Sequence, residues 1–348
     1  MKNLIFISSI LIILLKTGNV LSDNNIFNVN NIEIKNEASK NNEIQVNKAF
    51  QRAFDQLINR LLLKKDYLRF RDINLDQVKQ LVSYYQIINP DRKNKDNKKV
   101  SVNVYFDRER VHRFFYDNDI LYSDIIDTEV ILFPLLNIKK KNYIYTQNYF
   151  FENWNNEKSN YLIQYTLPVE NIESIQKINL NKDNLYELDV SDFFKEYENN
   201  NIVFAIIEIK KGSSKIFLKT KIQGKKINKA MYLEQKKRKS DEDFFKEIIL
   251  EMNDLINDLI KSQNLIDVRT PSFLNVKINL TKKNNLIAFN KRIEDIDLID
   301  NTYVQELNKD YVLVKIKYLG KINKLITTLK EKKINLIMTE GQWHLSIT

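Results

Sequence analysis

The chain has 348 residues, of which 43% are hydrophobic and 29% are charged, and its formal net charge is +10. This balance is typical of globular domains and excludes a mainly disordered chain, while the length suffices for two or three domains with cores of their own. Cysteine is absent, which excludes disulfides, thiolate chemistry and the lipid attachment of bacterial lipoproteins.

The positive charge fits three classes of partner: nucleic acid, an anionic membrane surface or an acidic protein. Lysine clusters occur at 139–141 and at Lys236–Lys239. Each lies between apolar segments and is typical of a loop. The abundance of Ile, Lys and Asn also fits an AT-rich coding sequence, so lysines solvated on exposed faces are the simpler interpretation.

The first 22 residues are typical of a secretory signal peptide. Lys2 supplies the basic start, an apolar run follows from Leu4 to Leu15, and Val20 and Ser22 occupy positions −3 and −1. We therefore predict cleavage between Ser22 and Asp23. A retained anchor is the alternative, although a spanning helix needs about 20 apolar residues. Export predicts a periplasmic protein, with or without peripheral contact to an anionic membrane and without a nucleic-acid partner.

Residues 23–127 are expected to form an α+β module in the order β-α-β-β-α. The stretch 26–34 alternates like a strand, and Asn42 with Gln45 resembles a capping box before a helix that reaches Leu61. Further strands are predicted within 81–88 and 100–106. Asp107 is placed to cap the next helix.

Residues 128–268 are expected to form an α/β module with a β-meander and a long C-terminal helix. The apolar run 130–136 predicts a central strand, 202–209 is the strongest strand signal, and 216–222 returns after a turn. The helix begins at Ser240. Its apolar stripe around Ile249 is broader than a coiled-coil seam, so we expect it to pack on the strands between 202 and 222.

Residues 269–348 are expected to form a small module in the order β-α-β-α-β, similar to half of a ferredoxin-like sandwich. Its closing strand would run from Leu336 to Ile347, with a bend at Gly341. The fold class is therefore α+β, a multi-domain chain built from small sheet-and-helix modules.

Several short motifs resemble an uncharacterised family of exported Gram-negative envelope proteins, domain of unknown function 2066. They are the helix end 57–61, the segments 82–84 and 104–107, the run that ends at Pro134, the segment 148–154 and the ending 336–345. The resemblance implies export and a role in the cell envelope, and it implies no activity.

Motifs for catalysis and cofactor binding are missing from the sequence. His112 and His344 lie in different regions, and neither a nucleophile elbow nor a phosphate-binding glycine loop is present. We therefore expect no metal, no cofactor and no catalytic residues. Trp343 alternates with polar neighbours and is predicted to be in the core. For Trp154 core packing is the simpler interpretation, and Asn148 and Trp154 are retained as candidate partner-binding residues.

Together these observations favour a non-catalytic periplasmic accessory or interaction protein of the cell envelope. Two alternatives remain open. One is a carboxylate-dependent hydrolase of an envelope polymer, which would need two carboxylates facing each other in a cleft. The other is a peripheral binder of anionic lipid that uses the lysine loops.

Overall fold

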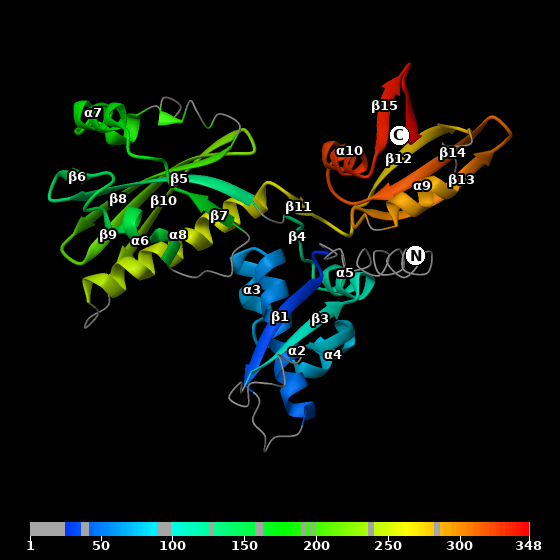
Figure 1. The fold of residues 1–348 in the computed structure, drawn as a ribbon, viewed down its shortest axis with the longest axis horizontal. Coiled ribbons are helices and arrows are strands. Elements are labelled where there is room, and N and C mark those ends of the chain that lie inside the picture. The colour runs from blue at the N-terminus through cyan, green and yellow to red at the C-terminus, as the bar shows by residue number, and fades with distance from the viewer. Residues whose placement is uncertain are drawn as a thin grey trace, which may run out of the picture.

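The computed structural model describes residues 25–35, 42–88, 99–125, 128–156, 163–188, 193–194, 197, 200–235, 240–281, 286–294 and 296–347. The predicted signal peptide, with its cleavage site between Ser22 and Asp23, lies outside these residues. Figure 1 shows three groups of helices and strands, and the α+β class predicted from the sequence is confirmed. Within the described ranges, no helix combines the length and the hydropathy needed to cross a membrane.

The first region contains a three-stranded antiparallel sheet in the order β1-β3-β2. Its elements are β1 (Asn28–Lys35), α2 (Asn42–Leu61), α3 (Lys64–Phe70), α4 (Leu75–Leu81), β2 (Val82–Ile88), β3 (Lys99–Phe106) and α5 (Arg108–Asp117). The predicted cap of α5 is confirmed, because Asp107 accepts a hydrogen bond from the Arg110 N–H at 3.0 Å. The two short helices α3 and α4 were not predicted; each has only seven residues.

The second region contains a mixed sheet in the order β10-β9-β8-β5-β6, with β7 paired to β5 beside β6. Its strands are β5 (Thr128–Ile138), β6 (Lys141–Tyr143), β7 (Ile163–Thr166), β8 (Asn201–Lys210), β9 (Ser213–Ile222) and β10 (Lys225–Glu234). Its α-helices are α6 (Tyr149–Asn153), α7 (Ile172–Leu180) and α8 (Asp241–Ser262), and short 3-10 turns cover 154–156 and 185–187.

Strand β5 is buried on both faces, which explains its continuous apolar sequence. Leu132 and Leu136 belong to the cluster beneath α8, whereas Phe133 and Leu135 belong to the cluster beneath α7. Alternate residues of a strand point to opposite faces, so α7 and α8 cover opposite sides of this sheet. The expected packing of α8 on the sheet is confirmed, because Ile249 is fully buried with residues of β8 and β9.

The third region differs from its predicted β-α-β-α-β order by two additional strands. The observed elements are β12 (Ser272–Asn279), α9 (Leu286–Ile293), β13 (Ile299–Leu307), β14 (Tyr311–Tyr318), α10 (Ile322–Glu331), β15 (Ile334–Thr339) and β16 (Gln342–Ile347). The segment predicted as one bent closing strand is a hairpin, because Glu340 and Gly341 both have positive φ, at 49° and 79°. β13 was not predicted, because most of its residues are exposed and its sequence therefore lacks the alternation of apolar and polar residues.

The hairpin changes the topology of the third sheet, whose order is β13-β14-β12-β16-β15. In a ferredoxin-like sheet the strand after the second helix pairs with the first strand. Here that strand, β15, lies at the edge, and β16 is inserted between it and β12.

The first and third regions share one cluster of buried residues. The chain enters the second region after β4 (Tyr122–Ser123) and leaves it at β11 (Leu265–Ile266). These two short strands pair antiparallel. Gly320 has a φ of +85°, and a Cβ there would lie 3.5 Å from Ile266 Cγ1. Arg269 also forms an ion pair with Asp119 at 2.6 Å.

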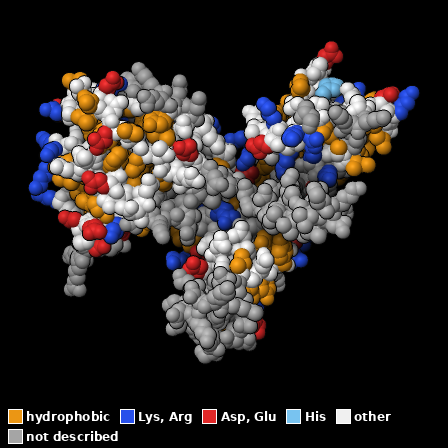
Figure 2. Space-filling model, in the orientation of Figure 1, with side chains coloured by type: hydrophobic (Ala, Val, Ile, Leu, Met, Phe, Trp, Pro, Cys, Tyr) orange, Lys and Arg blue, Asp and Glu red, His pale blue; other side chains and the backbone are white. Residues whose placement is uncertain are grey.

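The first and second regions meet where α8 ends. Lys261 is 3% exposed, and its Nζ donates to the carbonyl oxygens of Asn59 and Leu62 at 2.5 and 2.6 Å. These carbonyls lie at the C-terminal end of α2, where a cation interacts favourably with the helix dipole. Beside this contact, Lys64 Nζ lies 2.9 Å from the carboxylates of both Glu251 and Asp254. Figure 2 shows the second and third regions as separate lobes with an open notch between them.

Candidate functional site

The connections of β5 and β7 leave the sheet on opposite faces. From β5 the chain passes through β6 and α6 to β7, and α6 lies on the α8 side, where the rings of Tyr149 and Phe245 are 5.1 Å apart. From β7 it crosses through α7, on the other side, to β8. In α/β sheets, ligands bind beyond the carboxyl ends of strands whose connections diverge in this way.

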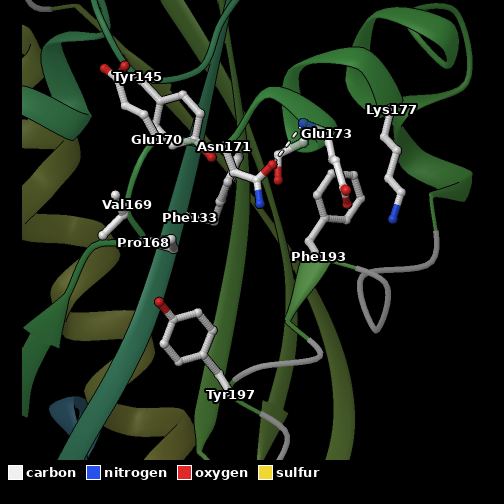
Figure 3. A pocket seen from close by; sticks show the side chains of 11 residues that line it. Phe133, Tyr145, Pro168, Val169, Glu170, Asn171, Glu173, Lys177, Phe193 and Tyr197 are labelled. Atoms are coloured by element: carbon white, nitrogen blue, oxygen red, sulfur yellow. Dashed lines mark hydrogen bonds between the residues drawn. The ribbon is translucent and has the colours of Figure 1, made fainter.

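A pocket of about 300 Å³ lies at this position, and Figure 3 shows the residues that surround it. Its lining begins two residues after the end of β7, with Pro168, Val169, Glu170 and Asn171. The other lining residues are Phe133, Tyr145, Glu173, Ser174, Lys177, Phe193 and Tyr197. They come from β5, the segment after β6, the first turns of α7 and the segment before β8.

Asn148 does not present its side chain to a partner, contrary to the interpretation from sequence. It is fully buried, and its Nδ2 donates to the carbonyl oxygens of Pro134 at 2.8 Å, Tyr143 at 3.1 Å and Ile144 at 3.0 Å. Its Oδ1 accepts from the Phe150 N–H at 3.1 Å and thereby caps α6. β7 pairs with residues 128–131 of β5 and β6 with 136–138. Asn148 therefore bonds the part of β5 that neither strand reaches.

Trp154 is likewise unavailable to a partner, because it is only 1% exposed. It packs in the cluster beneath α8, and its ring stands edge-on to that of Tyr165 at 5.4 Å between centroids. A large aromatic side chain in a short segment gains most by filling the space between a sheet and a helix. The simpler interpretation, that Trp154 packs in the core, is confirmed.

Aromatic rings form one wall of the pocket. The ring of Phe133 lies 5.7 Å from that of Tyr145 and 6.0 Å from that of Phe193. Lys177 Nζ lies 5.6 Å from the centre of the Phe193 ring, which is within the range of a cation–π contact. This wall offers an apolar surface, with the ammonium group of Lys177 at its edge.

Polar groups of the pocket are held by the start of α7. Asn171 caps the helix by accepting a hydrogen bond from the Glu173 N–H at 2.7 Å. The phenol of Tyr145 is hydrogen-bonded to the Ser174 side chain and to the Asn171 backbone, and burial raises its pKa above the ordinary value. Tyr145 thus remains protonated at neutral pH and fixes one side of the pocket.

The two carboxylates of the pocket do not face each other. In Figure 3, Glu170 and Glu173 point to different sides, with Tyr145 and Asn171 between them. Glycoside hydrolysis by paired carboxylates requires both groups to flank one bond. Glu170 and Glu173 do not have this arrangement.

Two apolar side chains beside the pocket are largely exposed. Val169, which lines the pocket, is 81% exposed, and Ile172, on the first turn of α7, is 73% exposed. Single exposed apolar residues are common on protein surfaces, but exposed apolar groups clustered around a concave site mark places where a partner binds.

The two histidines lie in separate environments. His112 on α5 is largely buried, its Nε2 lies 3.1 Å from the Tyr122 hydroxyl, and burial together with Arg108 lowers its pKa to about 4. His344 is on β16. Among the described residues, no group of three or more His, Cys, Asp or Glu side chains is arranged to hold a metal ion.

Comparisons with known proteins place the chain in no family. No family model matches the sequence, and no curated protein matches it. One solved structure, titled only as an uncharacterized protein, aligns with 9% sequence identity and a TM-score of 0.19, covering 40% of this chain and 93% of that one. A similarity this low carries no argument about fold or function.

The pocket residues were missed by the sequence analysis, although a signal for them existed. Strand β7 ends at Thr166. The next residues combine a proline, an Asn cap and the exposed Val169 and Ile172. Such a stretch after a parallel strand is where ligand-binding residues gather, but α7 itself was not predicted.

Proposed function

We propose that this chain is a non-catalytic accessory protein of the cell envelope that binds a protein partner at the pocket beside α7. The observation that supports binding most directly is the exposure of Val169 and Ile172, at 81% and 73%, next to a concave site with an aromatic wall. An apolar segment of a partner would cover these two side chains, while one of its own side chains would enter between Tyr145 and Phe193.

Location in the envelope rests on the sequence. The first 22 residues have the pattern of a cleaved signal peptide. The short motifs that resemble the envelope proteins with domain of unknown function 2066 support the same location. Sequencing the N-terminus of protein recovered from a periplasmic fraction tests this part, and we expect Asp23 as the first residue. A chain that begins at Met1 and fractionates with the inner membrane would contradict it.

Binding at the pocket is tested by photo-crosslinking in cells. A photoreactive amino acid is placed at Val169 and, as a control, at Ile287, which is 82% exposed on α9 of the third region. We expect a discrete crosslinked protein from Val169 that is absent from Ile287. Adding Phe193→Ala to the variant with the photoreactive amino acid at position 169 should reduce the yield of the crosslinked protein. Equal crosslinking from both sites, or a Val169 product that survives Phe193→Ala undiminished, would overturn the assignment of this pocket.

A further inference from the structure

Two hairpin turns lie next to each other at one end of the second region's sheet. β5 turns into β6 through residues 139–140, and β8 turns into β9 through residues 211–212. β5 and β8 are neighbouring parallel strands, and Ile138 at the end of β5 pairs with Ile209 of β8. Paired strands lie about 4.8 Å apart, so both turns extend from the same margin of the sheet.

Exposed lysines gather on these two turns, and we call this part of the surface the lysine margin. Its members are Lys139, Lys140, Lys141, Lys210 and Lys211. The carboxylates on the same strand ends are Glu208, which already forms an ion pair with Lys210 at 3.1 Å, and Glu234. Figure 2 shows Lys and Arg side chains along the margin of the second region that faces away from the third region. Positive charge therefore exceeds negative charge on these turns.

The backbone of the β5–β6 turn has a conformation that lysine seldom adopts. Lys139 and Lys140 both have positive φ, at 51° and 66°. Two-residue turns of this kind favour Asn-Gly or Asp-Gly, because a Cβ at positive φ crowds the backbone. Three other two-residue hairpin turns occur in the described ranges, and glycine holds the second position in each. These glycines are Gly212, Gly224 and Gly341.

Interactions with the described residues do not explain why lysine occupies positions 139 and 140. Neither ammonium group forms a hydrogen bond or an ion pair with another described residue. Asparagine followed by glycine would form the same turn with less strain. Strained backbone positions are concentrated at functional sites, and the property that these two side chains add to the turn is their charge.

We propose that the lysine margin binds the surface of a bilayer that contains anionic phospholipids. Its cations are all lysines, whose hydrated ammonium groups attract headgroups as point charges and do not need the fixed, planar geometry that arginine offers to a carboxylate. They stand on the ends of two turns, where they reach a flat surface together. The predicted export of the chain places it beside such surfaces. None of these lysines lines the pocket beside α7, so this inference does not depend on the proposed function.

Vesicle sedimentation tests whether the protein binds an anionic bilayer. The purified protein is mixed with vesicles of phosphatidylcholine alone or with phosphatidylglycerol added, and the bound fraction is measured after centrifugation. We expect binding only when phosphatidylglycerol is present. Raising the ionic strength from about 0.01 M to about 0.15 M should weaken it, because the Debye length falls from about 30 Å to about 8 Å. Equal binding to both vesicles would overturn the proposal. So would binding to neither at low salt, including by a chain that uses these lysines to bind an acidic protein.

Substitutions in the two turns test whether the lysine margin makes the contact. Lys139→Asn, Lys140→Gly and Lys211→Asn together remove three charges and give both turns the Asn-Gly sequence that they favour. This variant should therefore unfold at a higher urea concentration than the unmodified protein, which separates lost binding from lost structure. A lysine near an anionic surface contributes roughly fivefold to binding. We therefore expect the variant to bind phosphatidylglycerol vesicles roughly a hundredfold more weakly.

A second variant controls for net charge. Lys225→Gln, Lys226→Gln and Lys229→Gln also remove three exposed charges from the same sheet. Measured along β9 and β10, these residues lie roughly 15 to 30 Å from the turn at 211–212, which exceeds the Debye length of about 8 Å at physiological salt. The control should therefore change vesicle binding by less than about twofold. Equal losses in the two variants, or unchanged binding by the first, would overturn the assignment of this surface.

Discussion

At the scale of single residues, two buried polar side chains connect parts of the fold that secondary structure alone does not join. Asn148 bonds the unpaired stretch of β5 to the start of α6, and Lys261 bonds the end of α8 to the end of α2. Each makes several hydrogen bonds from one group. Buried polar atoms are tolerated when satisfied in this way, and they are costly when one partner is removed.

Asn148→Asp should destabilise the second region by about 3 kcal/mol, because a carboxyl group would replace the Nδ2 that serves three buried carbonyl oxygens. Urea unfolding followed by tryptophan fluorescence measures this, since Trp154 lies in the same core. Asn155→Asp, at an exposed neighbouring position, serves as the control and should change little. Equal effects of the two substitutions would contradict the role assigned to Asn148.

Lys261 makes stability depend on pH. Burial lowers its pKa from 10.5 to about 8 in the folded chain. Between these values the unfolded chain binds more protons than the folded one, so stability rises with pH. Relative to Lys261→Met, the unmodified chain should gain about 2 kcal/mol of unfolding free energy between pH 8 and pH 10. The unfolding free energies of the two proteins are measured by chemical denaturation at each pH. If both depend on pH in the same way, the Lys261 ammonium group is solvent-exposed and not buried.

At the scale of elements, α8 shows how burial divides two adjacent apolar residues. Ile249 is fully buried against the sheet, whereas Leu250 is 43% exposed on the same helix. A 3.6-residue period turns neighbouring side chains about 100° apart. The width of the apolar stripe, read from the sequence, correctly indicated packing on a sheet.

Ile249→Asp should lower the unfolding free energy of the second region by at least about 3 kcal/mol, because it buries an unpaired carboxylate. Leu250→Asp introduces the same charge one position away and should cost less than about 1 kcal/mol. Circular dichroism during urea unfolding compares them. If Ile249→Asp leaves the chain fully stable, α8 does not cover the sheet.

At the scale of the whole molecule, we expect the described residues to unfold as two units, because one cluster of buried residues spans the first and third regions. The first and third regions share one core, while the second has its own clusters on the two faces of its sheet. Residues at a common interface unfold together when neither side buries enough apolar surface alone.

Thermal unfolding should therefore show two transitions, one for the second region and one for the first and third regions together. The two tryptophans separate them, because Trp154 lies in the second region and Trp343 in the third. In calorimetry, Ile249→Asp should shift only the transition that Trp154 fluorescence reports. Three transitions, or one that moves as a whole, would contradict this division.

Sequence alone predicts the α+β class, the buried strands β5 and β8, the cap at Asp107 and the packing of α8 on its sheet. These features depend on local periodicity and on capping groups, which adjacent residues display directly. The hairpin β15–β16 could not be predicted, because it depends on the backbone angles of Glu340 and Gly341. The strand β13 could not be predicted, because it carries few apolar residues.

The positions of Asn148 and Trp154, and the set of residues around the pocket, follow from the tertiary fold. Asn148 is buried because β6 and β7 leave a gap along β5, a property of strand pairing that no single segment carries. The pocket likewise joins residues from Phe133 to Tyr197 that are far apart in the chain. The pairing of strands that are distant in the sequence brings such residues together, and local sequence patterns do not show which strands pair.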